Sequence, residues 1–194
     1  GATARGVDAE KAVEVFELMA KFADYGFNKS HAAAYALISY HTAWMKANHK
    51  VPFLAACMSL ARERTDKLAA LRQEAERLGV RVLPPDINRS GADFTVETQA
   101  DGKLAIRYAL AAIKKVGFAA MQSVEAARGD RPFTDLADFA ARVDPRQLNK
   151  MQVENLARAG AFDTLERSRA RVFAGAETIL RRAQAQAEEA SSGQ

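Results

Sequence analysis

The chain has 194 residues, 48% of them hydrophobic and 27% charged, with a formal net charge of +4, which excludes a disordered chain and indicates one large or two small folded domains. Its single cysteine excludes an internal disulfide framework. The mild basicity favours an anionic partner without proving one, and no apolar run approaches the ~20 residues of a membrane-spanning helix.

Hydrophobic residues spaced for one face of a helix recur through the first 78 residues. They predict four helices, at residues 8–23, 30–49, 52–60 and 65–78. Asp8, Ser30 and Thr65 are the expected N-caps, because their side chains can accept a backbone N–H of the first turn. Gly79 stands where a glycine in the left-handed conformation ends a helix.

The pattern changes after Gly79. Hydrophobic residues at 80–83, 94–96 and 104–106, with a turn signal at Asp101-Gly102, predict two or three short strands. Short helices are predicted next, each broken by glycine or proline, at residues 109–113, 118–128, 134–142 and 147–159. A longer helix is predicted at residues 168–190. We therefore expect a mainly α protein: a helical layer, a few short strands, paired short helices and a C-terminal helix.

A Lys-Lys-Val-Gly sequence lies between a helix end and a new helix start, as in a helix-hairpin-helix loop whose backbone N–H groups face a DNA phosphate. Gly117 would allow a close approach. Lys114, Lys115 and Arg128 would add attraction that is independent of DNA sequence. The usual loop has two glycines around an apolar residue, here Val116, and Lys115 takes the place of the first. An exposed helix–helix turn explains the same residues.

A second hairpin of this kind is predicted over residues 133–162. There Asn149 and Lys150 are the expected phosphate contacts, and Gly160 is expected to interrupt the helix. Two such hairpins in tandem would hold the backbone of duplex DNA.

Residues 25–35 enter a predicted helix N-terminus, where the helix dipole, a positive charge and aromatic rings could hold a phosphate and a base. A capping serine with core aromatics explains the same segment, and the residues alone favour that explanation. The residues of this candidate nucleotide or template site are Phe27, Asn28, Lys29, Ser30, His31 and Tyr35.

Signals for catalysis are missing from the sequence. His31, His41 and His49 lack the spacing of metal ligands, so we expect no metal site. There is no phosphate loop, dinucleotide fingerprint or nucleophile motif, and no tight carboxylate pair suggests a two-metal site. The residues alone predict a helical, basic protein that contacts DNA.

Residues 25–35, YGFNKSHAAAY, resemble a signature of the alpha subunits of bacterial DNA polymerase III, the replicative C-family DNA polymerases. Three further blocks agree with that family in order and spacing, at residues 78–88, 106–117 and 156–163. The Asn28-Lys29 pair resembles the replicative branch, because error-prone relatives typically have Pro-Glu there. The resemblance covers essentially the whole chain.

The resemblance implies a division of the chain. The regions are the C-terminal part of the polymerase fingers at 1–78, a strand-containing connector at 79–106, tandem helix-hairpin-helix units at 107–167, and a helix and linker toward a clamp-binding peptide at 168–194. The complete subunit would be a DNA-directed DNA polymerase, a nucleotidyltransferase. Its Mg²⁺ would be held by palm aspartates outside this chain. We therefore expect the chain to bind no cofactor and to be inactive alone.

The resemblance also implies roles and partners. Lys29 and His31 would lie near the nucleotide or template, and Phe27 and Tyr35 would form the wall of the site that holds the nascent base pair. Gln194 would be the first residue of the clamp-binding peptide. The expected partners are primer-template and duplex DNA, a deoxynucleoside triphosphate, the sliding clamp and other replicase subunits.

Two alternatives from other classes stay open. A non-enzymatic helix-hairpin-helix module of a repair protein would explain residues 106–163 but not the first helices, and a helical scaffold would bind only protein. The first residues do not resemble a signal peptide, so we expect a cytoplasmic protein without membrane contact. Because the chain starts without methionine and closes on Ser-Ser-Gly-Gln, we expect both ends to continue in a longer protein.

Overall fold

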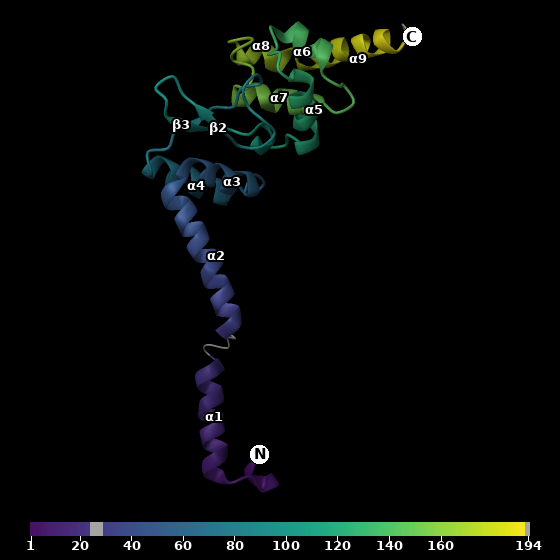
Figure 1. The fold of residues 1–194 in the computed structure, drawn as a ribbon. Coiled ribbons are helices and arrows are strands. Elements are labelled where there is room, and N and C mark those ends of the chain that lie inside the picture. The colour runs from purple at the N-terminus through teal and green to yellow at the C-terminus, as the bar shows by residue number, and fades with distance from the viewer. Residues whose placement is uncertain (24–28, 193–194) are drawn as a thin grey trace. The chain divides into compact units, whose positions relative to one another are not determined.

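A computed structural model describes residues 1–23 and 29–192 (Figure 1). Phe27, Asn28 and Gln194 of the predicted sites lie outside these residues, and Lys29 and Ser30 are described by their backbone. The chain divides into two compact units, residues 1–47 and 48–194.

The first unit consists of helices with exposed side chains. It contains a 3-10 turn, η1 (Thr3–Arg5), then α1 (Ala9–Ala23) and all but the last residue of α2 (Lys29–Asn48). The Asp8 carboxylate accepts the N–H groups of Glu10 and Lys11 at 3.0 and 3.1 Å, which confirms the predicted N-cap. The cap predicted at Ser30 is wrong, because Lys29, a good helix former, is already helical.

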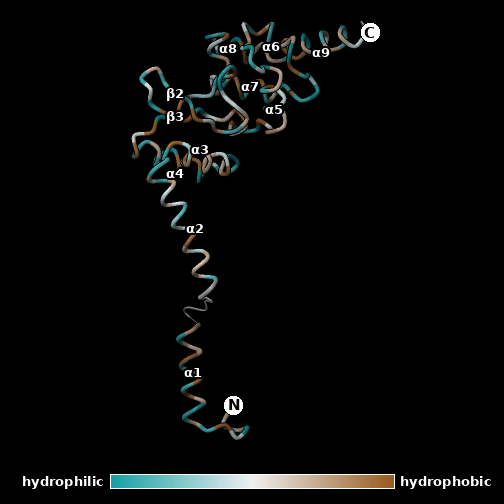
Figure 2. The backbone as a smooth tube through the Cα atoms, in the orientation of Figure 1, coloured by the Kyte–Doolittle hydropathy of each residue, from teal (hydrophilic) through white to brown (hydrophobic). Residues whose placement is uncertain are grey.

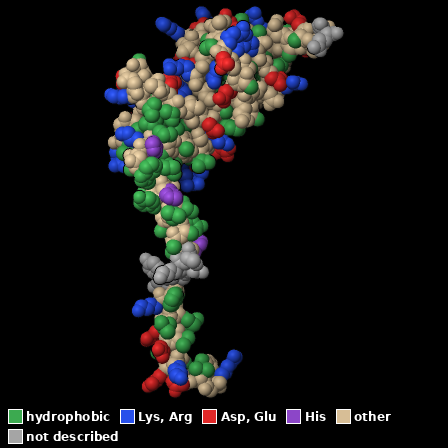
Figure 3. Space-filling view, in the orientation of Figure 1, with side chains coloured by type: hydrophobic (Ala, Val, Ile, Leu, Met, Phe, Trp, Pro, Cys, Tyr) green, Lys and Arg blue, Asp and Glu red, His purple; other side chains and the backbone are tan. Residues whose placement is uncertain are grey.

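Hydrophobic side chains of the first unit face solvent. Hydrophobic and hydrophilic positions alternate along both helices (Figure 2), and apolar side chains lie on their surface (Figure 3). Among the described residues before Asn48, none is buried. The most exposed large apolar side chains here are Phe16, Met19, Phe22 and Tyr40.

The second unit begins with two helices that pack on a small sheet. The helices are α3 (Lys50–Leu60) and α4 (Thr65–Arg77), and the strands are β1 (Val82–Leu83), β2 (Thr95–Thr98) and β3 (Leu104–Arg107). In the strand order β1-β3-β2, β3 runs parallel to β1 and antiparallel to β2. Leu54, Met58 and Ile106 are fully buried in their shared core. Gly79 has a φ of +69°, as predicted for a left-handed helix end.

Short helices form the rest of this unit. They are η2 (Leu110–Ala112), α5 (Phe118–Arg128), α6 (Leu136–Arg142), α7 (Lys150–Ala159), α8 (Arg169–Ala174) and α9 (Ala176–Ser192). Phe139 lies at the centre of their core, edge-to-face with Phe133 and Phe162 at ring-centroid distances of 5.1 and 5.2 Å. The single helix predicted at 168–190 is wrong, because the helix is interrupted at Gly175. Glycine is a poor residue for a helix interior, and it ends α8 here.

The mainly α prediction is confirmed: the described residues form nine α-helices and one mixed three-stranded sheet. None of the helices within residues 1–23 and 29–192 combines the length and hydrophobicity needed to cross a membrane.

Candidate nucleic-acid interface

The loop from Ile113 to Gly117 joins η2 to α5, where the hairpin was predicted. The Val116 N–H donates to the Ile113 carbonyl at 3.0 Å and closes a tight turn. The Val116 side chain is buried, whereas the Lys114 and Lys115 side chains are exposed. The apolar residue thus anchors the loop, and the two lysines face solvent.

Lys115 holds the backbone conformation that the usual loop assigns to glycine. Its φ is +62°, and no other non-glycine residue in the described part of the chain has a positive φ. The left-handed region costs a residue with a Cβ atom about 1 kcal/mol. The loop therefore keeps the glycine geometry, at the cost of some strain, and gains a positive charge at the same position.

The start of α5 is open to an anion. Its N-cap, Gly117, has no side chain to accept a first-turn N–H, and no side-chain cap forms. The first N–H groups of a helix have no partner within the helix and carry a partial positive charge. A Cβ atom on Gly117 would lie only 3.3 Å from Nε2 of Gln152, so glycine fits the close approach of α7. Backbone donors and two lysines meet at this end of α5.

Arg128, the third predicted cation of this hairpin, binds within the protein. Its guanidinium donates to the carbonyl oxygens of Ile87 and Ser90 at 2.9 and 2.6 Å. These bonds tie the end of α5 to the segment between β1 and β2. The Arg128 guanidinium therefore holds two segments of the second unit together.

In the second hairpin, between α6 and α7, side chains of the protein itself cap the helix start. Asn149 and Gln152 form a capping box: Asn149 Oδ1 accepts the Gln152 N–H at 3.0 Å, and Gln152 Oε1 accepts the Asn149 N–H at 2.9 Å. The Lys150 ammonium lies 3.1 Å from the Glu177 carboxylate on α9. Two backbone donors at this helix start and the Lys150 charge therefore have partners inside the chain.

In the first unit, two of the predicted nucleotide-site residues contact each other. His31 and Tyr35 lie one helical turn apart on α2, with their rings edge-to-face at a centroid distance of 4.5 Å. Both side chains are exposed. This part of α2 presents two rings in edge-to-face contact to solvent.

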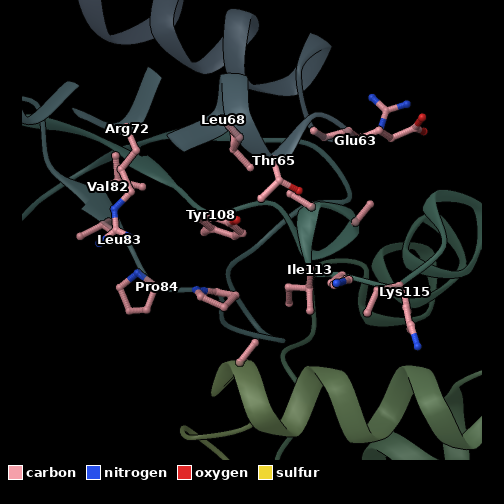
Figure 4. A pocket seen from close by; sticks show the side chains of 17 residues that line it. Glu63, Thr65, Leu68, Arg72, Val82, Leu83, Pro84, Tyr108, Ile113 and Lys115 are labelled. Carbon is pink, nitrogen blue, oxygen red and sulfur yellow. The ribbon is translucent and has the colours of Figure 1, made fainter. Parts of the chain in front are cut away.

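A cavity of about 950 Å³ opens beside the Lys114–Lys115 loop (Figure 4). It was missed in the sequence, because its walls come from four separate segments that no periodic pattern connects. Burial raises the pKa of the Tyr108 hydroxyl in its wall, and nearby Arg72 acts in the opposite direction. Within residues 1–23 and 29–192, no group of three or more His, Cys, Asp or Glu could hold a metal ion.

Known proteins resemble the chain over nearly its full length. A family model described as a helix-hairpin-helix motif matches residues 79–172. The DNA polymerase III subunit alpha of Caulobacter vibrioides is 54% identical over 185 residues, which are 95% of this chain and 16% of that protein. The subunit of Neisseria meningitidis serogroup B is 45% identical over 194 residues, 100% of this chain and 17% of that protein. The subunit of Thermus aquaticus is 45% identical over 195 residues, 100% of this chain and 15% of that protein.

These matches agree with the predicted family resemblance. The chain spans about one sixth of the length of these relatives. It belongs to the family of DNA polymerase III alpha subunits and includes their helix-hairpin-helix region.

Proposed function

We propose that the chain grips the backbone of duplex DNA through the Lys114–Gly117 loop and the start of α5. The proposal rests mainly on one observation: the backbone at Lys115 is left-handed, and it precedes a helix start that no side chain caps. First-turn N–H groups would donate to phosphate oxygens, and Lys114 and Lys115 would neutralise charge. Neither lysine has an ion-pair partner in the part of the chain that the structure describes. Because these contacts reach no base, binding is independent of DNA sequence.

We expect the joint replacement Lys114→Ala and Lys115→Ala to weaken duplex binding about tenfold at low salt. The slope of log K against log salt should flatten by about 1.8, because each neutralised phosphate contributes roughly 0.9. Fluorescence anisotropy of a labelled duplex across a salt series measures both quantities. An unchanged slope, with the circular dichroism spectrum intact, would exclude this loop as the contact.

Two control variants separate charge from geometry. Lys115→Gly keeps the left-handed backbone, so it should flatten the slope by only about 0.9 while stabilising the fold by about 1 kcal/mol. Lys150→Ala removes an exposed lysine of the other hairpin, where Glu177 already pairs with it. We expect its slope to stay close to that of the unaltered chain.

We further propose that the chain works as part of a complete replicative polymerase. In that setting residues 1–78 are the end of the fingers, 79–106 a connector and 107–167 the duplex grip, and 168–194 lead to a sliding-clamp peptide that begins at Gln194. The palm, outside this chain, supplies the Mg²⁺ ions that activate the primer end. The similarity to the alpha subunits supports this reading over a repair-protein module.

In the complete polymerase, Lys29 and His31 contact the incoming nucleotide or template, with Phe27 and Tyr35 beside the nascent base pair. We expect Lys29→Ala or His31→Ala to lower kcat/KM for the nucleotide about tenfold, the loss of one hydrogen bond to a charged group. Single-nucleotide incorporation kinetics measure this, with Lys21→Ala on α1 as control. If both variants have the same kcat/KM as the control, Lys29 and His31 do not contact the nucleotide or template.

A further inference from the structure

We propose that the cavity beside the Lys114–Lys115 loop binds one unpaired nucleotide of the DNA strand whose duplex the loop grips. The inference rests on the proposed function and adds an adjoining site to it. A volume of about 950 Å³ lies within the range of about 300–1,000 Å³ of small-ligand pockets. A base and its phosphate therefore fit.

The wall of the cavity offers a surface for a base. The Tyr108 side chain is half-buried, and the Phe94 ring holds it edge-to-face at a centroid distance of 4.9 Å. Figure 4 shows Tyr108 in the middle of the lining, between Leu83 and Ile113. A ring fixed on one side and open on the other is a platform on which any base can stack.

Positive charges stand at opposite ends of the same space. Arg72 of α4 and Lys115 of the loop are exposed and lie on opposite sides of Tyr108 (Figure 4). Arg72 has no ion-pair partner within residues 1–23 and 29–192. Arg62 also lines the cavity, but Asp93 holds its guanidinium at 3.0 Å. Glu63 is the single acidic residue among the described lining residues, so the surroundings favour phosphate.

The cavity is continuous with the proposed phosphate contact. Lys114, Lys115 and Val116 belong to the loop and also line the cavity. A strand held at the loop by its phosphates would reach the cavity with its next nucleotide. A paired base would first have to unpair and unstack, which costs free energy, so an unpaired nucleotide is the favoured occupant.

The test compares labelled duplexes that differ only at one end: blunt, with a single-stranded overhang, and with an abasic overhang of equal length. We expect the 194-residue chain to bind the overhang duplex about tenfold more tightly than the blunt one. The abasic overhang, which has the same phosphates, should lose most of this gain. An equal gain with the abasic overhang would assign the effect to charge and overturn the proposal.

Variants assign the gain to the cavity. Tyr108→Leu should abolish it and Tyr108→Phe should keep it, while both leave blunt-duplex binding unchanged. Arg72→Ala replaces an exposed residue of α4 and should also reduce the gain. It therefore tests the cavity independently if Tyr108→Leu does not fold. Normal, salt-dependent binding of the blunt duplex without any overhang gain would overturn this inference and leave the proposed function standing. Tight binding of a free deoxynucleoside monophosphate would assign the cavity to a free nucleotide and equally overturn it.

Discussion

Phe139→Ala is expected to lower the free energy of unfolding by about 4 kcal/mol, the cost of removing a fully buried phenylalanine and leaving a cavity. Phe139 is 0% exposed. Its ring lies between those of Phe133 and Phe162, which belong to the segments before α6 and after α7. The loss therefore loosens the contact between the segments that flank α6 and α7 as well as removing buried area. Urea denaturation of the 194-residue chain, followed by circular dichroism, measures it.

Phe173→Ala is the matched control for this change. Phe173 is only half-buried, with the Arg158 guanidinium 4.4 Å above its ring centroid. Its truncation should cost clearly less, because part of the ring already contacts water. Equal losses for the two variants would contradict the central place of Phe139 in the core.

Glu97→Ala should destabilise the second unit by about 2–3 kcal/mol, because it leaves a buried guanidinium without its counter-charge. The Arg107 side chain is 6% exposed, and its Nε and Nη2 atoms donate to the Glu97 carboxylate at 2.8 and 2.9 Å. The remaining Nη1 donates to the Pro84 carbonyl at 2.8 Å. Thermal and urea unfolding measure the effect. Glu177→Ala, which breaks an exposed pair with Lys150, should change stability by less than about 1 kcal/mol; an equal loss there would contradict the account.

The same pair predicts a dependence of stability on pH. Burial by itself raises the pKa of the Glu97 carboxyl, but donors from Arg107 and Gln99 outweigh it, so the pKa lies below its ordinary value of 4.5. A carboxyl with a lowered folded-state pKa stabilises the fold above its unfolded pKa, and the contribution is lost as the pH falls through the folded value. The free energy of unfolding measured with urea should therefore fall below pH 4.5. It should fall less steeply in Glu97→Gln. An identical pH profile in that variant would rule out this pair as a source.

Local signals in the sequence predicted much of the fold. The Asp8 cap, the left-handed Gly79 and the bounds of α5 each depend on a few neighbouring residues, and all are present. The break at Gly175 was missed because hydrophobic spacing continues across it. The glycine itself was the available warning.

The candidate site was only partly predictable. Asn149 followed by Gln152 has the spacing of a capping box, and that signal could have shown that the Asn149 side chain binds its own helix. No local signal could have shown that Arg128 binds carbonyls 38 and 41 residues earlier in the chain. The walls of the cavity likewise come together only through long-range packing.

The central claim is that phosphates meet the backbone at the start of α5 and not at the start of α7. Amide chemical shifts of the 194-residue chain, followed while duplex DNA is added, test it most directly. We expect the amides of residues 115–120 to shift with the duplex concentration, and those of Asn149 and Gln152, which the capping box engages, to stay in place. Unchanged amides at 115–120, or equal shifts at both helix starts, would contradict the account.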